Sequence, residues 1–431
     1  MANNKKAPQN KKVDENAQIK KQVKKVAKKA TKKALKNRNV QIAIAVIVVL
    51  LVIALVVVYF VKPEIFDFIL NPNTDNTGSG GNKNNGTGHV IDGASVVMTV
   101  IDVGQGDGIY IEFPTGENMF IDGGTEFQKP SRWTNITDVF TANNVTKLDY
   151  YMLTHLDYDH IRYTKQICDL LEIKHFYIPY IYEEYLDNDK WYTSTWITAY
   201  TAIKAETYTE NGATKNAVIS TNISTFDLGG DSWVMHCYTY EQADYPPMAT
   251  LSSKGNWASD SHHKNSISPV CFLQYAGRTI CLTGDQNEEG EEYLNNKGYF
   301  DAYDVDVLKV AHHGSREGTN KATFLDKVDP EYAIISVGAE NGYKHPHTEL
   351  ITRLNEYQDV TPDTDANGIQ KVYKTSEDGN VTVTIASTGT IDITSANDSS
   401  KNVQAVACVM YGDNNNIEIV YVAYIKKEGE E

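Results

Sequence analysis

The 431-residue sequence has few cysteines, and their pattern excludes two common small-domain scaffolds. An odd number at wide spacing fits neither a disulfide framework nor a zinc knuckle. The five cysteines are Cys168, Cys237, Cys271, Cys281 and Cys408. Cys271 and Cys281 lie in apolar stretches on either side of an expected turn at Ala276-Gly277, so they could meet across a hairpin. We expect them instead to be buried thiols of the core.

Positive charge is scarce outside the N-terminus. Residues 1–38 carry 14 Lys and Arg against 2 Asp and Glu, which leaves 26 basic and 54 acidic residues in the rest, a formal charge of −28. Proteins that grip nucleic acid through its phosphates usually present a basic surface, which argues against that class. A metal-centred site that acts on a phosphate is still allowed.

A single long apolar run, residues 40–61, has no charged residue. At 1.5 Å per residue a helix of this length spans the roughly 30 Å core of a bilayer. The run is too long for a signal peptide and no small-residue cleavage site follows it, so we expect a retained single-pass transmembrane anchor. The basic segment 1–39 is then cytoplasmic and the acidic remainder extracytoplasmic, at the cell membrane.

Lysine pairs recur every four residues between Lys20 and Lys33. They fit either a helix with a basic face against anionic lipid or a solvated basic tail. Residues 62–89 include an Asn-, Gly-, Thr- and Ser-rich stretch that cannot bury a core, and we expect a flexible linker there.

The stretch Thr154-His155-Leu156-Asp157-Tyr158-Asp159-His160 is the strongest chemical signal. It follows an apolar run, 148–153, that is typical of a buried strand, and it places His155, Asp157, Asp159 and His160 within six residues. That density does not fit one helix face, but a loop leaving a strand end can turn several side chains to one point. Imidazole and carboxylate are ligands for zinc, manganese or iron.

Further metal-type residues recur at the ends of expected strands. Asp285 follows the strand 278–282, His312 and His313 follow 305–310, and His345 and His347 precede a helix at 348–357. Because a sheet presents its strand ends along one edge, we expect these residues to converge. We assign residues 90–395 to this domain and 396–431 to a C-terminal β-hairpin extension with an acidic tail. Aromatic residues crowd residues 176–208, where most should be core and a few could form a lid or a box for a quaternary ammonium.

Taken together, these motifs resemble the metallo-β-lactamase fold superfamily, and more narrowly the hydrolase domain of ComEC-type competence proteins. The motifs that carry the resemblance are Ile101-Asp102-Val103-Gly104-Gln105-Gly106-Asp107, Ile121-Asp122-Gly123-Gly124, Thr154–His160, Leu282-Thr283-Gly284-Asp285, 308–315 and His345-Pro346-His347. The resemblance implies an α/β fold, a four-layer αββα sandwich, with a metal site along one sheet edge. Unlike a ComEC-type protein, this chain has one expected span and no multi-span channel domain.

The resemblance also implies roles for matching residues. His155 and Asp157 would face a first ion, and Asp159 and His160 a second. Asp285 would bridge the two ions, and Asp122 would orient a ligand from behind. A histidine from a later strand end would complete the second site. His312, His313 and His345 are the candidates, and we favour His313, with His345 and His347 nearer the substrate.

Two positions depart from the superfamily pattern. Asp157 and Asn265 stand where the superfamily usually has histidine. Because each change replaces an imidazole nitrogen with an oxygen, the site of the first ion should prefer harder cations and should bind metal more weakly. One or two divalent ions, zinc or manganese, are then the expected cofactors. His262 or His263 could fill the gap, although a polar loop pair is more often solvated.

We therefore expect a membrane-anchored, metal-dependent hydrolase of phosphoesters, most of all a phosphodiesterase or nuclease-like enzyme. One of His313, His345 and His347 would protonate the leaving oxygen. The substrate could be nucleic acid or a cell-envelope polymer, and no protein partner is expected. The alternatives are a phosphorylcholine-esterase-like enzyme, a lactonase or β-lactamase, and a non-catalytic tethered binding module.

Overall fold

The computed structural model describes residues 90–125, 132–221, 225–241, 244, 260–356, 372–397, 403–411 and 417–425. The basic segment, the apolar run 40–61, the linker and the acidic tail lie outside these residues, so those predictions stand untested. Among the described residues, no helix combines the length and the apolar character needed to cross a bilayer.

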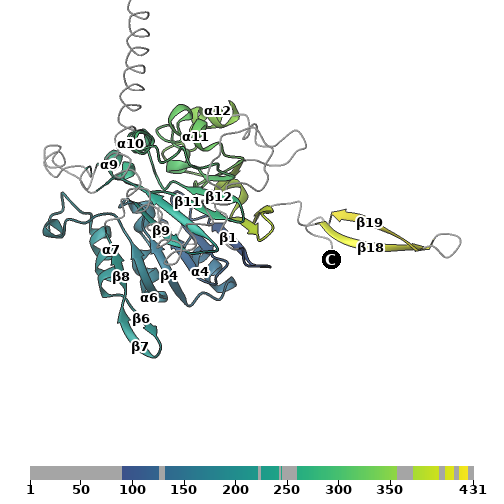
Figure 1. The fold of residues 1–431 in the computed structure, drawn as a ribbon, viewed down its shortest axis with the longest axis horizontal. Helices are drawn as coiled ribbons and strands as arrows, with labels where there is room; N and C mark the ends of the chain where they lie inside the picture. The colour runs from purple at the N-terminus through teal and green to yellow at the C-terminus, as the bar shows by residue number, and fades with distance from the viewer. Residues whose placement is uncertain are drawn as a thin grey trace, which may run out of the picture. The chain divides into compact units, whose positions relative to one another are not determined.

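Two large β-sheets form the body of the domain (Figure 1). The first has the strand order β17-β16-β1-β2-β3-β4-β5-β8. Its strands are β1 (Ser95–Val100), β2 (Ile109–Glu112), β3 (Asn118–Ile121), β4 (Lys147–Met152), β5 (Glu172–Tyr177), β8 (Val218–Ser220), β16 (Val381–Ala386) and β17 (Ile391–Ser395). The second has the order β15-β14-β13-β12-β11-β10-β9. Its strands are β9 (Thr225–Gly229), β10 (Val234–Tyr238), β11 (Val270–Tyr275), β12 (Arg278–Leu282), β13 (Val307–Lys309), β14 (Tyr332–Ile335) and β15 (Val372–Lys374).

Two small hairpins accompany the sheets. They are β6 (Thr207–Glu210) with β7 (Ala213–Asn216), and β18 (Val403–Tyr411) with β19 (Ile417–Ile425). The second lies within residues 396–431, for which a β-hairpin extension is predicted. The described helices are α4 (Arg132–Ala142), α5 (Tyr158–Ile161), α6 (Thr164–Leu170), α7 (Ser194–Ala205), α9 (Ser261–Ser266), α10 (Glu288–Asn296), α11 (Asp326–Val328), α12 (Thr348–Glu356) and α13 (Thr375–Asp378). The other helical turns are the 3₁₀ turns η1 (Glu183–Tyr185) and η3 (Ala311–Gly314) and the π-helical turn η4 (Lys321–Leu325).

Three clusters of buried side chains separate four layers, which are helices, the first sheet, the second sheet and helices again. Strand β4 sends Tyr151 to a core shared with α4, α6 and α7, and Met152 to the core between the two sheets. Strand β11 likewise alternates Leu273, between the sheets, with Phe272, which packs with α10 and α12. This period of two is what a strand covered on both faces requires. The α/β class and the αββα sandwich are therefore what the structure has (Figure 1).

The aromatic segment 176–208 mostly fills the first outer core. Trp196 is completely buried, and Tyr185 stacks on Trp191 with ring centroids 4.7 Å apart. These rings contact one another, so the core role expected for most of them is correct. Helices α5 and α6 are separated at Tyr163, whose N–H donates to the Gly123 carbonyl oxygen.

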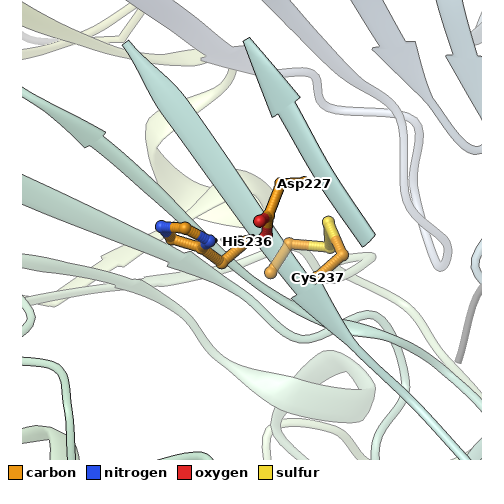
Figure 2. The surroundings of a disulfide bond; sticks show 4 residues. Asp227, His236 and Cys237 are labelled. Carbon is orange, nitrogen blue, oxygen red and sulfur yellow. Dashed lines mark hydrogen bonds and ion pairs between the residues drawn. A yellow bond between two sulfur atoms is a disulfide. The ribbon is translucent and has the colours of Figure 1, made fainter. Parts of the chain in front are cut away.

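One cysteine prediction is wrong. Cys271 forms a disulfide with Cys237 (Figure 2), whereas Cys281 is a buried free thiol. Cys237 and Cys271 are register partners on the antiparallel strands β10 and β11, with Cα atoms 4.0 Å apart. Each cysteine side chain is directed to the core between the sheets. Strand β11 has a neighbour on each side, β12 with Cys281 and β10 with Cys237, and the disulfide forms with β10.

We expect this disulfide to stabilise the domain. It closes a loop with a sequence separation of 34, for which loop-closure entropy in the unfolded chain corresponds to about 2–4 kcal/mol. Guanidinium unfolding with and without reductant measures this, and reduction should lower the midpoint. The reductant effect should vanish in Cys237→Ala/Cys271→Ala and persist in Cys168→Ala. Equal midpoints for the oxidised and reduced wild-type protein would contradict the assignment.

Candidate metal centre

The candidate site lies where parallel strands of both sheets end. Strand β3 runs parallel to β4, and β12 runs parallel to β13, which is parallel to β14. Asp122 follows β3, His155 follows β4, Asp285 follows β12, and His313 follows β13. The carboxyl ends of parallel strands meet at one edge, which is where open α/β sheets bind ligands. The expected convergence of strand ends is therefore present.

Four side chains form a compact cluster at this edge. Asp159, His160, Asp285 and His313 each offer one ligand-type atom, and these atoms all lie within 4.8 Å of one another. Asp285 Oδ1 is 3.2 Å from His160 Nε2, and Asp285 Oδ2 is 3.3 Å from His313 Nε2. Asp159 Oδ2 lies 3.4 Å from the same nitrogen of His313. Among the three candidate histidines, the geometry thus brings His313 into the cluster with the pair 159–160.

The hydrogen bonds behind the two imidazoles aim their Nε2 atoms at a common point. His160 Nδ1 is 2.7 Å from Asp122 Oδ2, and His313 Nδ1 is 2.9 Å from the Ser336 carbonyl oxygen. Since carboxylate and carbonyl oxygens only accept, both Nδ1 atoms carry the proton. The two Nε2 atoms are 3.2 Å apart, and in neutral rings both would present lone pairs. Two converging lone pairs and two carboxylates fit a divalent cation.

The electrostatics of the cluster lead to the same conclusion. Although burial opposes it, the carboxylates of Asp285 and Asp122 raise the pKa of His160 well above its usual range. Burial likewise opposes, but Asp285 and Asp159 raise the pKa of His313 to about 10. The buried carboxylates thus require positive charge, which protons on the imidazoles supply in the absence of a metal ion.

The backbone around the cluster is strained and tightly packed. His312 and His313, in η3, have φ values of 48° and 53°, a left-handed conformation that costs about 1–3 kcal/mol each in residues other than glycine. A Cβ on Gly106 would come within 2.3 Å of the Asp159 carbonyl oxygen, so the 101–107 loop can support the 159–160 turn only with glycine there. Strain held in this way is frequent at functional sites.

The other half of the stretch Thr154–His160, which contains His155 and Asp157, is differently arranged. His155 is fully buried, and its Nε2 has no hydrogen-bond partner within the described part of the chain. That atom is 3.9 Å from Asp157 Oδ2 and 3.9 Å from Asp285 Oδ2. Burial lowers the pKa of His155 well below its usual range, so the ring is neutral. Asp157, however, forms an ion pair with Lys264.

The remaining predicted residues surround this half. Asn265 Nδ2 is 3.3 Å from His312 Nε2, and His312 Nε2 is 3.8 Å from Asp285 Oδ2. His312 therefore lies beside the cluster rather than within it. His262 and His263 belong to helix α9, not to a loop, and they contact Glu289 and Asp260. Asn265 and its neighbour Lys264 thus occupy the place where the superfamily pattern led us to expect a histidine.

His345 and His347 lie at the rim of the site. Their rings are 4.7 Å apart, and the His345 ring is 5.4 Å from that of His312. His345 Nδ1 is 3.2 Å from Gln105 Nε2, and His347 Nδ1 accepts from the Arg316 N–H at 3.1 Å. Both side chains are half-buried.

A buried ion pair between Lys309 and Asp107 lies behind the cluster, and it was not predicted from the sequence. Lys309, fully buried, contacts Asp107 and donates to the Gly284 carbonyl oxygen at 3.1 Å. Asp107 Oδ1 is also 3.6 Å from His313 Nδ1. The available signal was a lysine in the otherwise apolar strand β13, because a buried lysine requires a partner. This pair links three of the motif loops.

Comparison with known proteins identifies relatives by sequence. The chain is 28% identical over 291 residues to ComE operon protein 3 of Bacillus subtilis, covering 64% of this chain and 33% of that protein. It is 36% identical over 104 residues to Competence protein ComA of Neisseria gonorrhoeae, covering 24% of this chain and 15% of that protein. The predicted resemblance to competence proteins is confirmed. The chain spans about a third or less of the length of these relatives.

Comparisons with solved structures and with protein-family models give less information about relatives. YhfI from Bacillus subtilis, a metallo-β-lactamase fold protein, is 12% identical with a TM-score of 0.35, covering 69% of this chain and 99% of that one. No protein-family model matches the sequence.

We expect Asp122 to control metal affinity. Asp122 is fully buried, accepts from the Thr154 N–H and hydroxyl at 2.8 Å each, and holds His160. Asp122→Asn should weaken metal binding about 10–100-fold, because the ligand loses its orienting carboxylate. Manganese titration of the purified protein measures the change. Asp149→Asn, at another buried carboxylate that contacts Asn118 instead, is the matched control. Unchanged affinity in Asp122→Asn would contradict the assigned role.

Proposed function

We propose that this protein is a membrane-anchored, extracytoplasmic, metal-dependent phosphodiesterase. The observation that carries the proposal is the cluster of Asp159, His160, Asp285 and His313, whose carboxylates, one buried and one half-buried, and converging imidazole nitrogens suit a divalent ion. Zinc and manganese both accept this mixed nitrogen and oxygen set. Similarity to competence proteins favours nucleic acid as the phosphodiester, within a DNA-uptake context.

A divalent ion in this cluster would supply Lewis-acid polarisation of the phosphoryl group and an activated water. His160 and His313 would bind through Nε2, and Asp159 and Asp285 through carboxylate oxygens. Asp122 holds His160, and the Ser336 carbonyl oxygen holds His313, so neither ring can rotate freely. Fixed donors of this kind avoid reorganisation during the reaction.

His345 is suited to donate a hydrogen bond to the substrate. Gln105 Oε1 accepts from the Gly338 N–H at 3.2 Å, which orients the amide so that its Nε2 donates to His345 Nδ1. The proton of a neutral His345 is therefore on Nε2. Burial and the neighbouring histidines lower the pKa of His345 to about 3, so it is neutral at pH 7. A neutral imidazole can still stabilise the leaving oxygen by donating from Nε2.

The proposed location has two supports. The uncharged run 40–61 is long enough to cross a membrane, with the lysine-rich segment before it expected on the cytoplasmic side. The Cys237–Cys271 disulfide is of a kind that persists in oxidising compartments, as expected for an extracytoplasmic domain.

Loss of the Asp285 carboxylate should abolish turnover. Asp285→Asn removes one of the two negative charges of the cluster, so we expect kcat/KM for a phosphodiester to fall at least about 100-fold, while folding is retained. The assay uses the full-length protein in detergent with bis(p-nitrophenyl) phosphate and single-stranded DNA. Asp392→Asn, on β17, is the control.

Lactone and lactam substrates belong in the same panel. Turnover of these without phosphodiester turnover would assign the protein to the lactonase or β-lactamase class. No turnover of any substrate by a metal-loaded protein would favour the tethered binding module.

The role of His345 can be tested with two leaving groups. His345→Ala should lower kcat about 100-fold or more for a diester with a poor, alkoxide leaving group. The effect should be small for a p-nitrophenolate leaving group, which needs little stabilisation. Equal losses on both substrates would show that His345 acts in binding or folding instead.

A further inference from the structure

The half of the site that contains His155 and Asp157 holds a lysine. The resemblance to the metallo-β-lactamase superfamily led us to expect a metal ion there. Lys264, on α9, is only 5% exposed, and its ammonium forms an ion pair with Asp157. Asp157 is the carboxylate that would have faced the first ion. A lysine so buried is held there by this pairing, since an uncompensated buried charge is strongly unfavourable.

The charge left in this half does not suit a second divalent ion. Lys264 already compensates the single negative charge of Asp157, and the neighbouring His155 and Asn265 side chains contribute none. Asp285 also approaches this half, with Oδ2 3.9 Å from His155 Nε2, but it belongs to the cluster with His160 and His313 as well. A second ion would have to enter beside an ammonium group that repels it.

We propose that the Lys264 ammonium replaces the first cation, so that the site holds one divalent ion, at Asp159, His160, Asp285 and His313. Lys264 is then a positioning residue that fixes Asp157 and supplies a permanent positive charge beside the ion. The inference rests on the metal-dependent hydrolase proposed above. It concerns the number of ions, so it can fail while that function stands.

The other donors of a first site are still in place. His155 Nε2 and Asn265 Oδ1 are both buried and have no hydrogen-bond partner within the described residues. Together with Asp157 and Asp285 they would offer one nitrogen and three oxygens, a set that manganese accepts. In this arrangement the lysine alone keeps the second ion out, and its removal should restore a second binding site.

Metal stoichiometry tests the proposal directly. The full-length protein in detergent is stripped with chelator and titrated with Mn²⁺, with bound metal counted by elemental analysis and by electron paramagnetic resonance. Wild-type protein should bind one ion per chain. Lys264→Met, which keeps the length of the side chain and removes its charge, should bind two ions and show spin coupling between them. Lys165→Met, at an exposed lysine paired with Asp169, should bind one.

Substitutions of the two aspartates provide a second test that does not need Lys264→Met to fold. Asp157→Asn should still bind one ion, whereas Asp159→Asn should lose it. Two ions in wild-type protein, or one in a folded Lys264→Met variant, would overturn the proposal. Loss of the single ion in Asp157→Asn would also overturn it, because the ion would then belong to the other half. If one ion is found but no phosphodiester is cleaved, only the proposed function fails.

Discussion

The cluster depends on one constraint, which is that two carboxylates, Asp159 and Asp285, converge in a site that is largely closed to water. Asp285 is only 2% exposed, and the imidazoles around it are fully buried or nearly so. Carboxylates in such a place must be neutralised by protons or by a cation. The Nδ1 atoms of His160 and His313 are each committed to an oxygen acceptor, so the rings offer Nε2 to whatever provides that charge.

The rest of the fold holds these four side chains together against unfavourable terms. The left-handed conformation of His312 and His313 and the buried Lys309–Asp107 pair are each costly in isolation. They persist because three apolar cores stabilise the sandwich and fix the strands from which the loops emerge. The loops in turn contact one another, for example where Gly106 admits the Asp159 carbonyl group.

Short-range patterns in the sequence were sufficient for the strands and for the convergence of their ends, whereas the four-layer sandwich was predicted from the resemblance of the motifs to a known superfamily. Alternating or continuous apolar runs marked the strands, and metal-type residues at their ends marked the site. The same patterns did not reveal which cysteines pair, because Cys237 and Cys271 meet through strand register, a long-range property. They also did not separate His312 from His313, since that choice depends on the backbone conformation of η3 and on a contact with Ser336.

Lys264 shows why the chemistry of a site is harder to predict than its location. The sequence showed that Asp157 and Asn265 depart from the superfamily's histidine pattern, but this indicated only that the site of the first ion should bind metal more weakly. The identity of the cation in that half depends on a side chain from α9 reaching Asp157 across 107 positions of the chain, which no local pattern encodes. A phosphodiester bound at this edge would meet the fixed charge of Lys264 on one side and the ion of the cluster on the other. Such local positive charge explains how a domain with a strongly acidic composition could still accept an anionic substrate, because attraction at contact distance outweighs the screened repulsion of distant surface carboxylates.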